Sequence, residues 1–333
     1  MLTFGFTLLT SDIAIGRRTQ KSAIGAYAEM HPKWKFLGIL TFLVPVLIMT
    51  YYAVIGGWIT KYAVVYLTGQ AEAAAQDNYF MDFITSPVAP VIFALLFMAV
   101  TALIVYNGVE GGIEKVSRFM MPVLLVLVIV IAVYSLTLKS TDAAGQVRTG
   151  MQGFLYYITP HVEGLTVGRF LQILLDAMSQ LFFSLSVSMG IMITYGSYVK
   201  PEVDLNKAVN QIEFFDTGVA LLAGVMIIPA VFVFSGTDGM SAGPSLMFVS
   251  LPNSSAAQLL DIMDYISNSV MMPLIALLST ILIGWVKTPQ FVIGEMERNG
   301  ESFRRKKMYI IMIRYIAPVL MLILFLQSTG ILS

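Results

Sequence analysis

Long apolar runs alternate with short polar stretches along the whole chain of 333 residues. A helix that crosses the hydrocarbon core of a bilayer needs about 20 predominantly apolar residues, and most of these runs reach that length. Seven runs are long enough to be predicted as spans, and we add the shorter run 1–16 as an eighth. The pattern predicts an all-α polytopic membrane protein with about eight transmembrane helices in a single transmembrane domain, 1–333. The other predicted helices lie near 37–64, 89–107, 119–138, 170–196, 212–235, 266–286 and 309–328.

Composition supports a membrane protein and excludes several other classes. Hydrophobic residues make up 57% of the chain and charged residues 12%, whereas about a quarter of the residues of soluble domains are charged. The formal net charge is zero, which leaves no basic excess for a nucleic-acid partner. Cysteine is absent, and the sequence contains no nucleotide-binding or hydrolase motif. We therefore predict that the chain is not an enzyme.

Basic residues mark one side of the predicted membrane. Cytoplasmic connections carry an excess of Lys and Arg, and every second connection here is basic. The alternate connections hold only Lys61, Lys139, Arg148 and Arg169. We predict a multi-pass protein of the cytoplasmic membrane with both termini outside. The basic, cytoplasmic side holds Arg17, Arg18, Lys21, Lys33, Lys35, Lys115, Arg118, Lys200, Lys207, Lys287, Arg298, Arg304, Arg305, Lys306 and Lys307.

Polar residues inside a predicted span are costly in a bilayer and need a reason. In "QLFFSLSVSMG" (180–190), Ser184, Ser186 and Ser188 recur at every second position. Helix neighbours are three and four residues apart, so this spacing forms no polar stripe on a continuous helix. Two interpretations stand. The hydroxyls bond to nearby carbonyls or to packed helices, or the helix is unwound there and offers oxygen atoms to an ion or substrate.

Three carboxylates lie in or beside apolar runs. Asp216 is interpreted as a carboxylate at the cytoplasmic interface, as a helix N-cap, or as a buried cation ligand. Asp264 lies at the external boundary of its span. It is interpreted either as a helix cap or as one side of an external ion-pair gate. For Asp12 we expect a buried ion pair with Arg17 or Arg18.

Tyr51 and Tyr52 lie in the middle of the predicted span 37–64. This depth is too great for the aromatic belt that marks a membrane interface. Their hydroxyls therefore either bond to neighbouring helices or are offered to a ligand.

Seven stretches, in order along nearly the whole chain, resemble the neurotransmitter:sodium symporter family, and most of all its bacterial amino-acid transporters. They occur in the same order as in the family, and the stretches 108–122 and 180–199 are the most specific. The seven are "SDIAIGRRTQKS" (11–22), "PVLIMTYYAVIGGW" (45–58), "GVEGGIEKVSRFMMP" (108–122), "QLFFSLSVSMGIMITYGSYV" (180–199), "DTGVALLAGVMIIPAVF" (216–232), "SAGPSLMFVSLP" (241–252) and "LDIMDY" (260–265).

The resemblance implies a leucine-transporter-like fold of two five-helix inverted repeats, with substrate and sodium at the membrane midplane beside broken helices. It also implies sodium-coupled symport of an amino acid by alternating access. Matched position by position, the substrate pocket would be lined by Ile48, Tyr52, Phe183, Ser186 and Met189, with Tyr52 hydrogen-bonded to the substrate carboxylate. The apolar Ile48 and Met189 suggest a neutral, hydrophobic or aromatic amino acid.

The same matching assigns ion and gate residues. Ser184 and Asp216 fall at ligands of the substrate-adjacent sodium, and Asp264 at the acidic partner of the external gate. Many relatives have Asn where Asp216 stands, and Ala220 offers no hydroxyl at the family's chloride position. A fixed carboxylate is expected to reduce any need for chloride, so chloride dependence stays open.

The departures from the family concern whole helices. The resemblance implies that the chain begins partway through the second family helix. In "FVSLPNSSAAQLLDIMDY" (248–265) the loop before the eighth helix runs directly into the tenth, so helices eight and nine are expected to be missing. The inverted repeat would be incomplete. The expected partners are an amino acid, membrane lipid, and a second copy of the chain or an intact homologue. The alternative function is that of a transport-dead fragment or of an accessory protein of an intact transporter.

Overall fold

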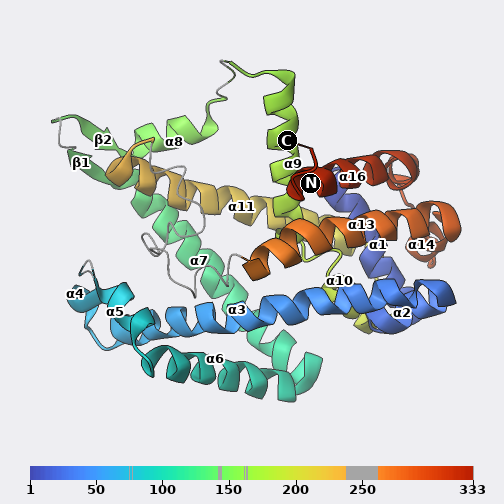
Figure 1. The fold of residues 1–333 in the computed structure, drawn as a ribbon, viewed down its shortest axis with the longest axis horizontal. Coiled ribbons are helices and arrows are strands. Elements are labelled where there is room, and N and C mark those ends of the chain that lie inside the picture. Colours follow the sequence, from blue (N-terminus) through green and yellow to red (C-terminus); the bar gives the residue numbers. More distant parts are fainter. Residues whose placement is uncertain are drawn as a thin grey trace. The chain divides into compact units, whose positions relative to one another are not determined.

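The computed structural model describes residues 1–74, 76, 78–141, 145–160, 162, 164–237 and 262–332. The chain divides into two compact units. Unit 1 comprises Met1–Met49, Glu163–Thr217 and Leu259–Ser333, and unit 2 comprises Thr50–Val162 and Gly218–Gln258. Figure 1 traces the chain, which is helical apart from one short pair of strands in the described ranges.

Within the described residues, six helices are long and apolar enough to cross a membrane. Two predicted spans are missing from this set. The helix α1 (Phe4–Thr19) has 16 residues, fewer than the about 20 that a span needs, and the predicted span 170–196 is divided into two shorter helices. The six spans are Pro32–Leu67, Ala89–Tyr106, Val109–Thr137, Leu205–Ser235, Ile262–Val286 and Lys306–Ser328.

Unit 1 is built around α1, in which nearly every side chain is buried. The core around it is apolar and includes Phe6, Leu9 and Ile15, whose removal from water favours folding. The other elements of unit 1 are α2 (Ala23–Met30), η1 (Pro32–Trp34), the first part of α3 (Lys35–Leu67), α9 (Val167–Ser184), α10 (Ile191–Tyr198), the first part of α11 (Leu205–Ser235), η5 (Tyr265–Met271), α13 (Met272–Ile281), η6 (Leu282–Val286), α14 (Gln290–Met296), α15 (Lys306–Ile311), η7 (Met312–Ile316) and α16 (Ala317–Ser328).

Glycines let α1 lie directly against α10. A side chain on Gly16 would collide with the backbone of Ile193, and one on Gly196 would collide with the backbone of Ile13. Small residues are the usual means by which helix backbones approach closely in membrane proteins. The contact fixes α10 beside the most buried helix of the unit.

Hydroxyl pairs tie the N-terminal helices to the C-terminal ones. The hydroxyls of Ser11 and Tyr309 lie 2.8 Å apart, and those of Tyr27 and Ser279 lie 2.7 Å apart. Burial raises the pKa of Tyr27, so its phenol stays neutral and keeps its hydrogen-bonding proton. These buried polar atoms are satisfied, as a packed interior requires.

A buried ion pair lies at the end of α1. Nε of Arg17 donates to Oε1 of Glu295 at 2.6 Å, and its terminal nitrogens donate to the carbonyls of Val203 and Glu295. The Arg17 side chain is 0% exposed and that of Glu295 is 6% exposed. Because an unpaired buried charge is very costly, this set of oxygens allows the arginine to be buried.

Unit 2 contains the second parts of α3 and α11 and the elements from α4 to α8. Gly56 and Gly57 of α3 lie against Phe97 and the backbone of Ala94 in α6. No side chain of α6 is buried, which suits a helix that faces lipid. The elements are α4 (Ala71–Ala74), α5 (Tyr79–Thr85), α6 (Ala89–Tyr106), η2 (Val109–Glu114), α7 (Lys115–Thr137), β1 (Lys139–Thr141), β2 (Val147–Thr149) and α8 (Gly150–Ile158), with β1 and β2 antiparallel.

Candidate ion and substrate site at a broken helix

The predicted span 170–196 is interrupted in its middle. The helix α9 ends at Ser184 and α10 begins at Ile191, and residues 185–190 form turns between them (Figure 1). Ser186, Ser188 and Gly190 have φ angles of 51°, 62° and 75°. A left-handed φ is uncommon for residues other than glycine. The structure therefore confirms that the helix is unwound at these serines, and the offer of their oxygen atoms to an ion or substrate stays a prediction.

Alternating side chains anchor the break in the core of unit 1. Leu185, Val187 and Met189 are 1%, 1% and 3% exposed. Their burial offsets the strain of the left-handed residues, which persist only where the surroundings hold them. The backbone of the break is thus fixed in place, and its N–H and C=O groups are no longer all used by a helix.

Asp12 of α1 caps one of these backbone groups. The N–H of Ser188 donates to Oδ2 of Asp12 at 2.9 Å, and the Asp12 side chain belongs to the buried set. A carboxylate that accepts a backbone N–H satisfies a donor that would otherwise be buried without a partner. Asp12 therefore stabilises the non-helical conformation of the break.

The expectation that Asp12 pairs with Arg17 or Arg18 is wrong. Arg17 pairs with Glu295, and Arg18 donates to the carbonyl of Phe291. Only residues three or four apart face each other on a helix, and Asp12 is five and six residues from the two arginines. This spacing was the signal in the sequence that could have excluded the pair.

Ser184 and Asp216 meet beside the break. The hydroxyl of Ser184, the last residue of α9, donates to Oδ1 of Asp216 on α11. Ser184 is exposed and Asp216 is half-buried. The bond of Ser184 runs to a neighbouring helix rather than to a carbonyl of its own helix.

Asp216 is not a helix N-cap. The helix α11 begins at Leu205, so Asp216 lies well inside it, and the sequence-based start near 212 was too late. The residues from Asn206 to Gln211 are mostly polar, and they carry no hydrophobic periodicity that would reveal the first turns of a helix. Because Asp216 lies inside α11, its interpretation as a helix N-cap is wrong.

The proposed substrate residues fall in both units. Phe183 and Ile48 are half-buried at the edge of the unit 1 core, Met189 is buried, and Ser186 is half-buried. Three of these residues belong to the break or to the last turn of α9. Tyr52 belongs to unit 2, is 42% exposed, and packs edge to face against Tyr51 at 5.5 Å between ring centres.

Asp264 lies at the start of the penultimate span. The side-chain amide of Asn268 donates to its Oδ1 at 2.5 Å. Its side chain makes no capping hydrogen bond to the first turn of η5, and the helix already begins at Ile262 among the described residues. The prediction that Asp264 acts in an external gate stays a prediction.

Two kinds of oxygen that could hold a cation lie together at the break. Hard cations take hydroxyl, carbonyl and carboxylate oxygens, and Ser184 and Asp216 supply two of these types next to the unwound backbone. In the part of the chain that the structure describes, no group of three His, Cys, Asp or Glu side chains could hold a metal ion.

Six described helices could cross a membrane, and a further predicted span is broken at residues 185–190, with Asp216 bonded to Ser184 beside the break. Discontinuous helices of this kind are typical of secondary transporters. The sequence profile of the "Sodium:neurotransmitter symporter family" matches residues 1–82 and 81–253. The chain belongs to this family, whose members are multi-pass proteins of the plasma membrane and not enzymes.

The names of several similar proteins describe them as sodium-dependent transporters. The chain is 35% identical to the "Uncharacterized sodium-dependent transporter YhdH" of Bacillus subtilis, over 75% of this chain and 53% of that protein. It is 31% identical to an "Uncharacterized sodium-dependent transporter" of Haemophilus influenzae, over 76% and 55%. A third, MJ1319 of Methanocaldococcus jannaschii, is 28% identical over 76% and 52%. The chain spans about half the length of these relatives.

Proposed function

We propose that the chain takes part in sodium-coupled symport of a neutral, hydrophobic or aromatic amino acid across the cytoplasmic membrane by alternating access. Its architecture is then a leucine-transporter-like fold in a single transmembrane domain. About eight spans form an incomplete version of the five-plus-five inverted repeat. The observation that carries the proposal is the meeting of Ser184 and Asp216 beside the break between α9 and α10.

The ion is held by oxygens from two helices. Ser184 contributes a hydroxyl and Asp216 a carboxylate, and the unwound backbone nearby contributes carbonyl dipoles. In the structure the Ser184 hydroxyl donates a hydrogen bond to the Asp216 carboxylate. The lone pairs of the serine oxygen are then free to face a cation. Sodium is a transported substrate here, and its gradient supplies the energy for uptake.

The substrate binds beside the ion in a pocket of mixed character. Ile48, Phe183 and Met189 offer apolar surface, and Ser186 leaves room for a bulky side chain. The hydroxyl of Tyr52 donates a hydrogen bond to the substrate carboxylate. Asp264 forms the acidic half of the external gate, and the fixed charge of Asp216 reduces any need for chloride.

Uptake by the purified chain in liposomes tests this proposal. Under an inward sodium gradient, labelled leucine or phenylalanine should accumulate, and it should accumulate much less when choline replaces sodium. Asp216→Ala and Ser184→Ala each remove an ion ligand, so the sodium concentration for half-maximal uptake should rise about tenfold or more. Replacing chloride with gluconate should leave wild-type uptake unchanged.

Ser197→Ala is a matched control. The Ser197 hydroxyl bonds only to the carbonyl of Thr194 within α10 among the described residues, so its loss should leave the sodium dependence unchanged. Uptake by folded protein no greater than in empty liposomes would contradict symport by this chain. That result would favour the alternative, a transport-dead fragment or an accessory protein of an intact transporter.

A further inference from the structure

The first turns of α11 extend beyond the hydrocarbon core of a bilayer. The helix has 31 residues and is about 46 Å long at about 1.5 Å per residue, whereas the hydrocarbon core is about 30 Å thick. Its first two turns carry Asn206, Lys207, Asn210 and Gln211. These polar residues place the start of α11 at the level of the lipid headgroups, on the basic side of the membrane.

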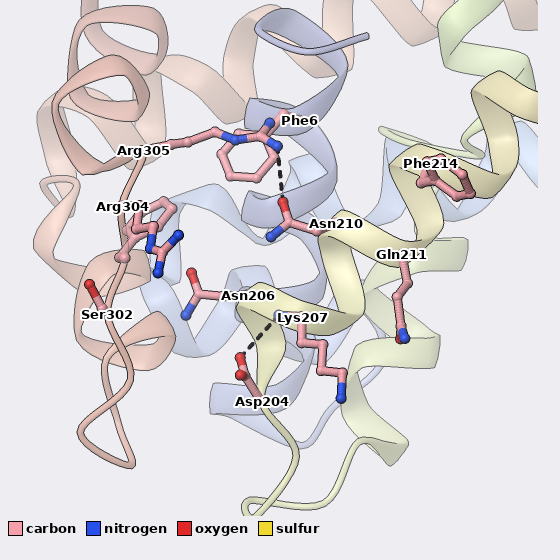
Figure 2. Close-up of a pocket in the computed structure, with 11 residues that line it drawn as sticks. Phe6, Asp204, Asn206, Lys207, Asn210, Gln211, Phe214, Ser302, Arg304 and Arg305 are labelled. Atoms are coloured by element: carbon pink, nitrogen blue, oxygen red, sulfur yellow. Dashed lines mark hydrogen bonds between the residues drawn. The ribbon is translucent and has the colours of Figure 1, made fainter.

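An open cleft of about 750 Å³ lies at this end of unit 1. Figure 2 shows that its walls come from the start of α11, from α1 and from the segment before α15. Its lining carries three cations, Lys207, Arg304 and Arg305, and one carboxylate, Asp204. The cleft is therefore positively charged.

The cations of the cleft differ in their partners. Arg305 bonds to Glu213 at 2.9 Å and to Asn210 at 3.0 Å, and its guanidinium lies over the ring of Phe6. The side chains of Arg304 and Lys207 make no ion pair or hydrogen bond with any described residue, although Arg298 and Lys306 nearby are both paired with glutamates.

The remaining carboxylate of the cleft, that of Asp204, forms no ion pair with Lys207 or Arg304 in the described part of the chain. Asp204 accepts the backbone N–H of Lys207 at 3.0 Å, as a helix cap (Figure 2). In the same view the guanidinium of Arg304 points into the cleft toward Asn206, with Ser302 on its other side. The amide of Asn206 already donates to the carbonyl of Met296 at 2.9 Å, so the donors around this opening that suit phosphate oxygens are the guanidinium of Arg304 and the hydroxyl of Ser302.

Apolar surface continues from the cleft along α11. Phe214, which lines the cleft, is 74% exposed, and Phe215 beside it is 60% exposed. A free phosphate ion would gain nothing from these rings, whereas the acyl chains of a lipid would cover them. Basic pockets between helices on the cytoplasmic side are suited to anionic headgroups.

We propose that this cleft binds the phosphate group of an anionic phospholipid of the cytoplasmic leaflet through Arg304 and Lys207, with the acyl chains over Phe214 and Phe215. Arg305, which Glu213 neutralises, shapes the cleft and is not a phosphate ligand. The site is separate from the break between α9 and α10, and it does not depend on transport by this chain.

Lipid retention measured by native mass spectrometry tests the proposal. The purified chain is titrated with phosphatidylglycerol, with phosphatidylcholine, and with inorganic phosphate as a competitor. Wild type should retain phosphatidylglycerol in preference to phosphatidylcholine. Arg304→Gln and Lys207→Gln should each weaken phosphatidylglycerol binding about fivefold, since one basic residue near an anionic lipid contributes about that factor.

Lys200→Gln is the matched control, because Lys200 is an exposed cation of unit 1 outside the cleft. It should retain phosphatidylglycerol like wild type, and all variants should unfold at the wild-type temperature. Equal losses in Lys200→Gln and Arg304→Gln would overturn the proposal, because they would show attraction to surface charge alone. Displacement of the lipid by inorganic phosphate at equal concentration would overturn the lipid as the source of the phosphate group.

Discussion

At the scale of single residues, Asp12 and Arg17 of α1 both bond to residues that lie far away in the sequence. Asp12 accepts the N–H of Ser188, and Arg17 donates to Glu295, 278 positions further along the chain. Both side chains are buried, so each partner removes a large desolvation cost. The two contacts attach α1 to the break and to α14.

Asp12→Ala should destabilise the folded chain. The Ser188 N–H would lose its acceptor inside the core, which costs about 1–3 kcal/mol. Asp12→Asn keeps a carbonyl oxygen as an acceptor and should lose less. Thermal unfolding in one detergent measures both variants, and an alanine variant as stable as wild type would show that the N–H finds another acceptor.

Arg17→Leu should cost more than the loss of an exposed pair. It leaves Glu295 buried with only the partly exposed Arg298 as an ionic partner, and breaking a buried pair costs about 3–5 kcal/mol. Lys21→Leu removes one side of the exposed pair with Glu29 and should cost about 0–1 kcal/mol. The same unfolding measurement compares them, and equal losses would refute the argument from burial.

At the scale of elements, the contact between α1 and α10 decides where the broken helix lies. Gly16 and Gly196 allow the two backbones to touch, and residues 185–190 then enter the core of unit 1 beside Asp12. The break places the end of α9 against α11, where Ser184 meets Asp216. The proposed ion site is therefore a consequence of helix packing and not of one segment alone.

Gly16→Ala should destabilise this packing. The new Cβ would overlap the backbone of Ile193, and overpacking of this kind costs about 1–3 kcal/mol. Gly168→Ala in α9 is the control, because no atom lies within 4 Å of its added Cβ, and it should be neutral or slightly stabilising. A Gly16→Ala variant that unfolds at the wild-type temperature would show that α1 and α10 can move apart at little cost.

At the scale of the whole molecule, the distribution of basic residues sets the orientation in the membrane. Fifteen of the 20 Lys and Arg residues fall on one predicted side, and this asymmetry is the main determinant of orientation. The same side contains the buried Arg17–Glu295 pair and the cleft with Arg304.

The absence of cysteine makes the orientation directly testable. Gln70→Cys is predicted to face outward and should react with a membrane-impermeant maleimide in intact cells. Lys200→Cys is predicted to face the cytoplasm and should react only after the membrane is made permeable. Both side chains are exposed in the structure, so labelling of Lys200→Cys in intact cells would contradict the predicted orientation.

The sequence predicted most helices because apolar runs are a local signal. The run 89–107 coincides with α6 (Ala89–Tyr106), and the run 309–328 lies within the span Lys306–Ser328. It missed the start of α11 at Leu205, since polar helical turns look like a connection. The unwound interpretation of 184–188 was available from the sequence because a spacing of two fits no helical face.

By itself, the sequence determined the class of protein, the helical runs, the basic side and the residues that mark the break, because hydrophobicity, charge and spacing are properties of neighbouring residues. Only the tertiary structure decided that Asp12 caps Ser188, that Arg17 pairs with Glu295, and that Arg304 and Lys207 share a cleft, where neither forms an ion pair with a described residue. These contacts join residues roughly 100 to 280 positions apart. No local pattern specifies such pairs, because they depend on which helices pack together.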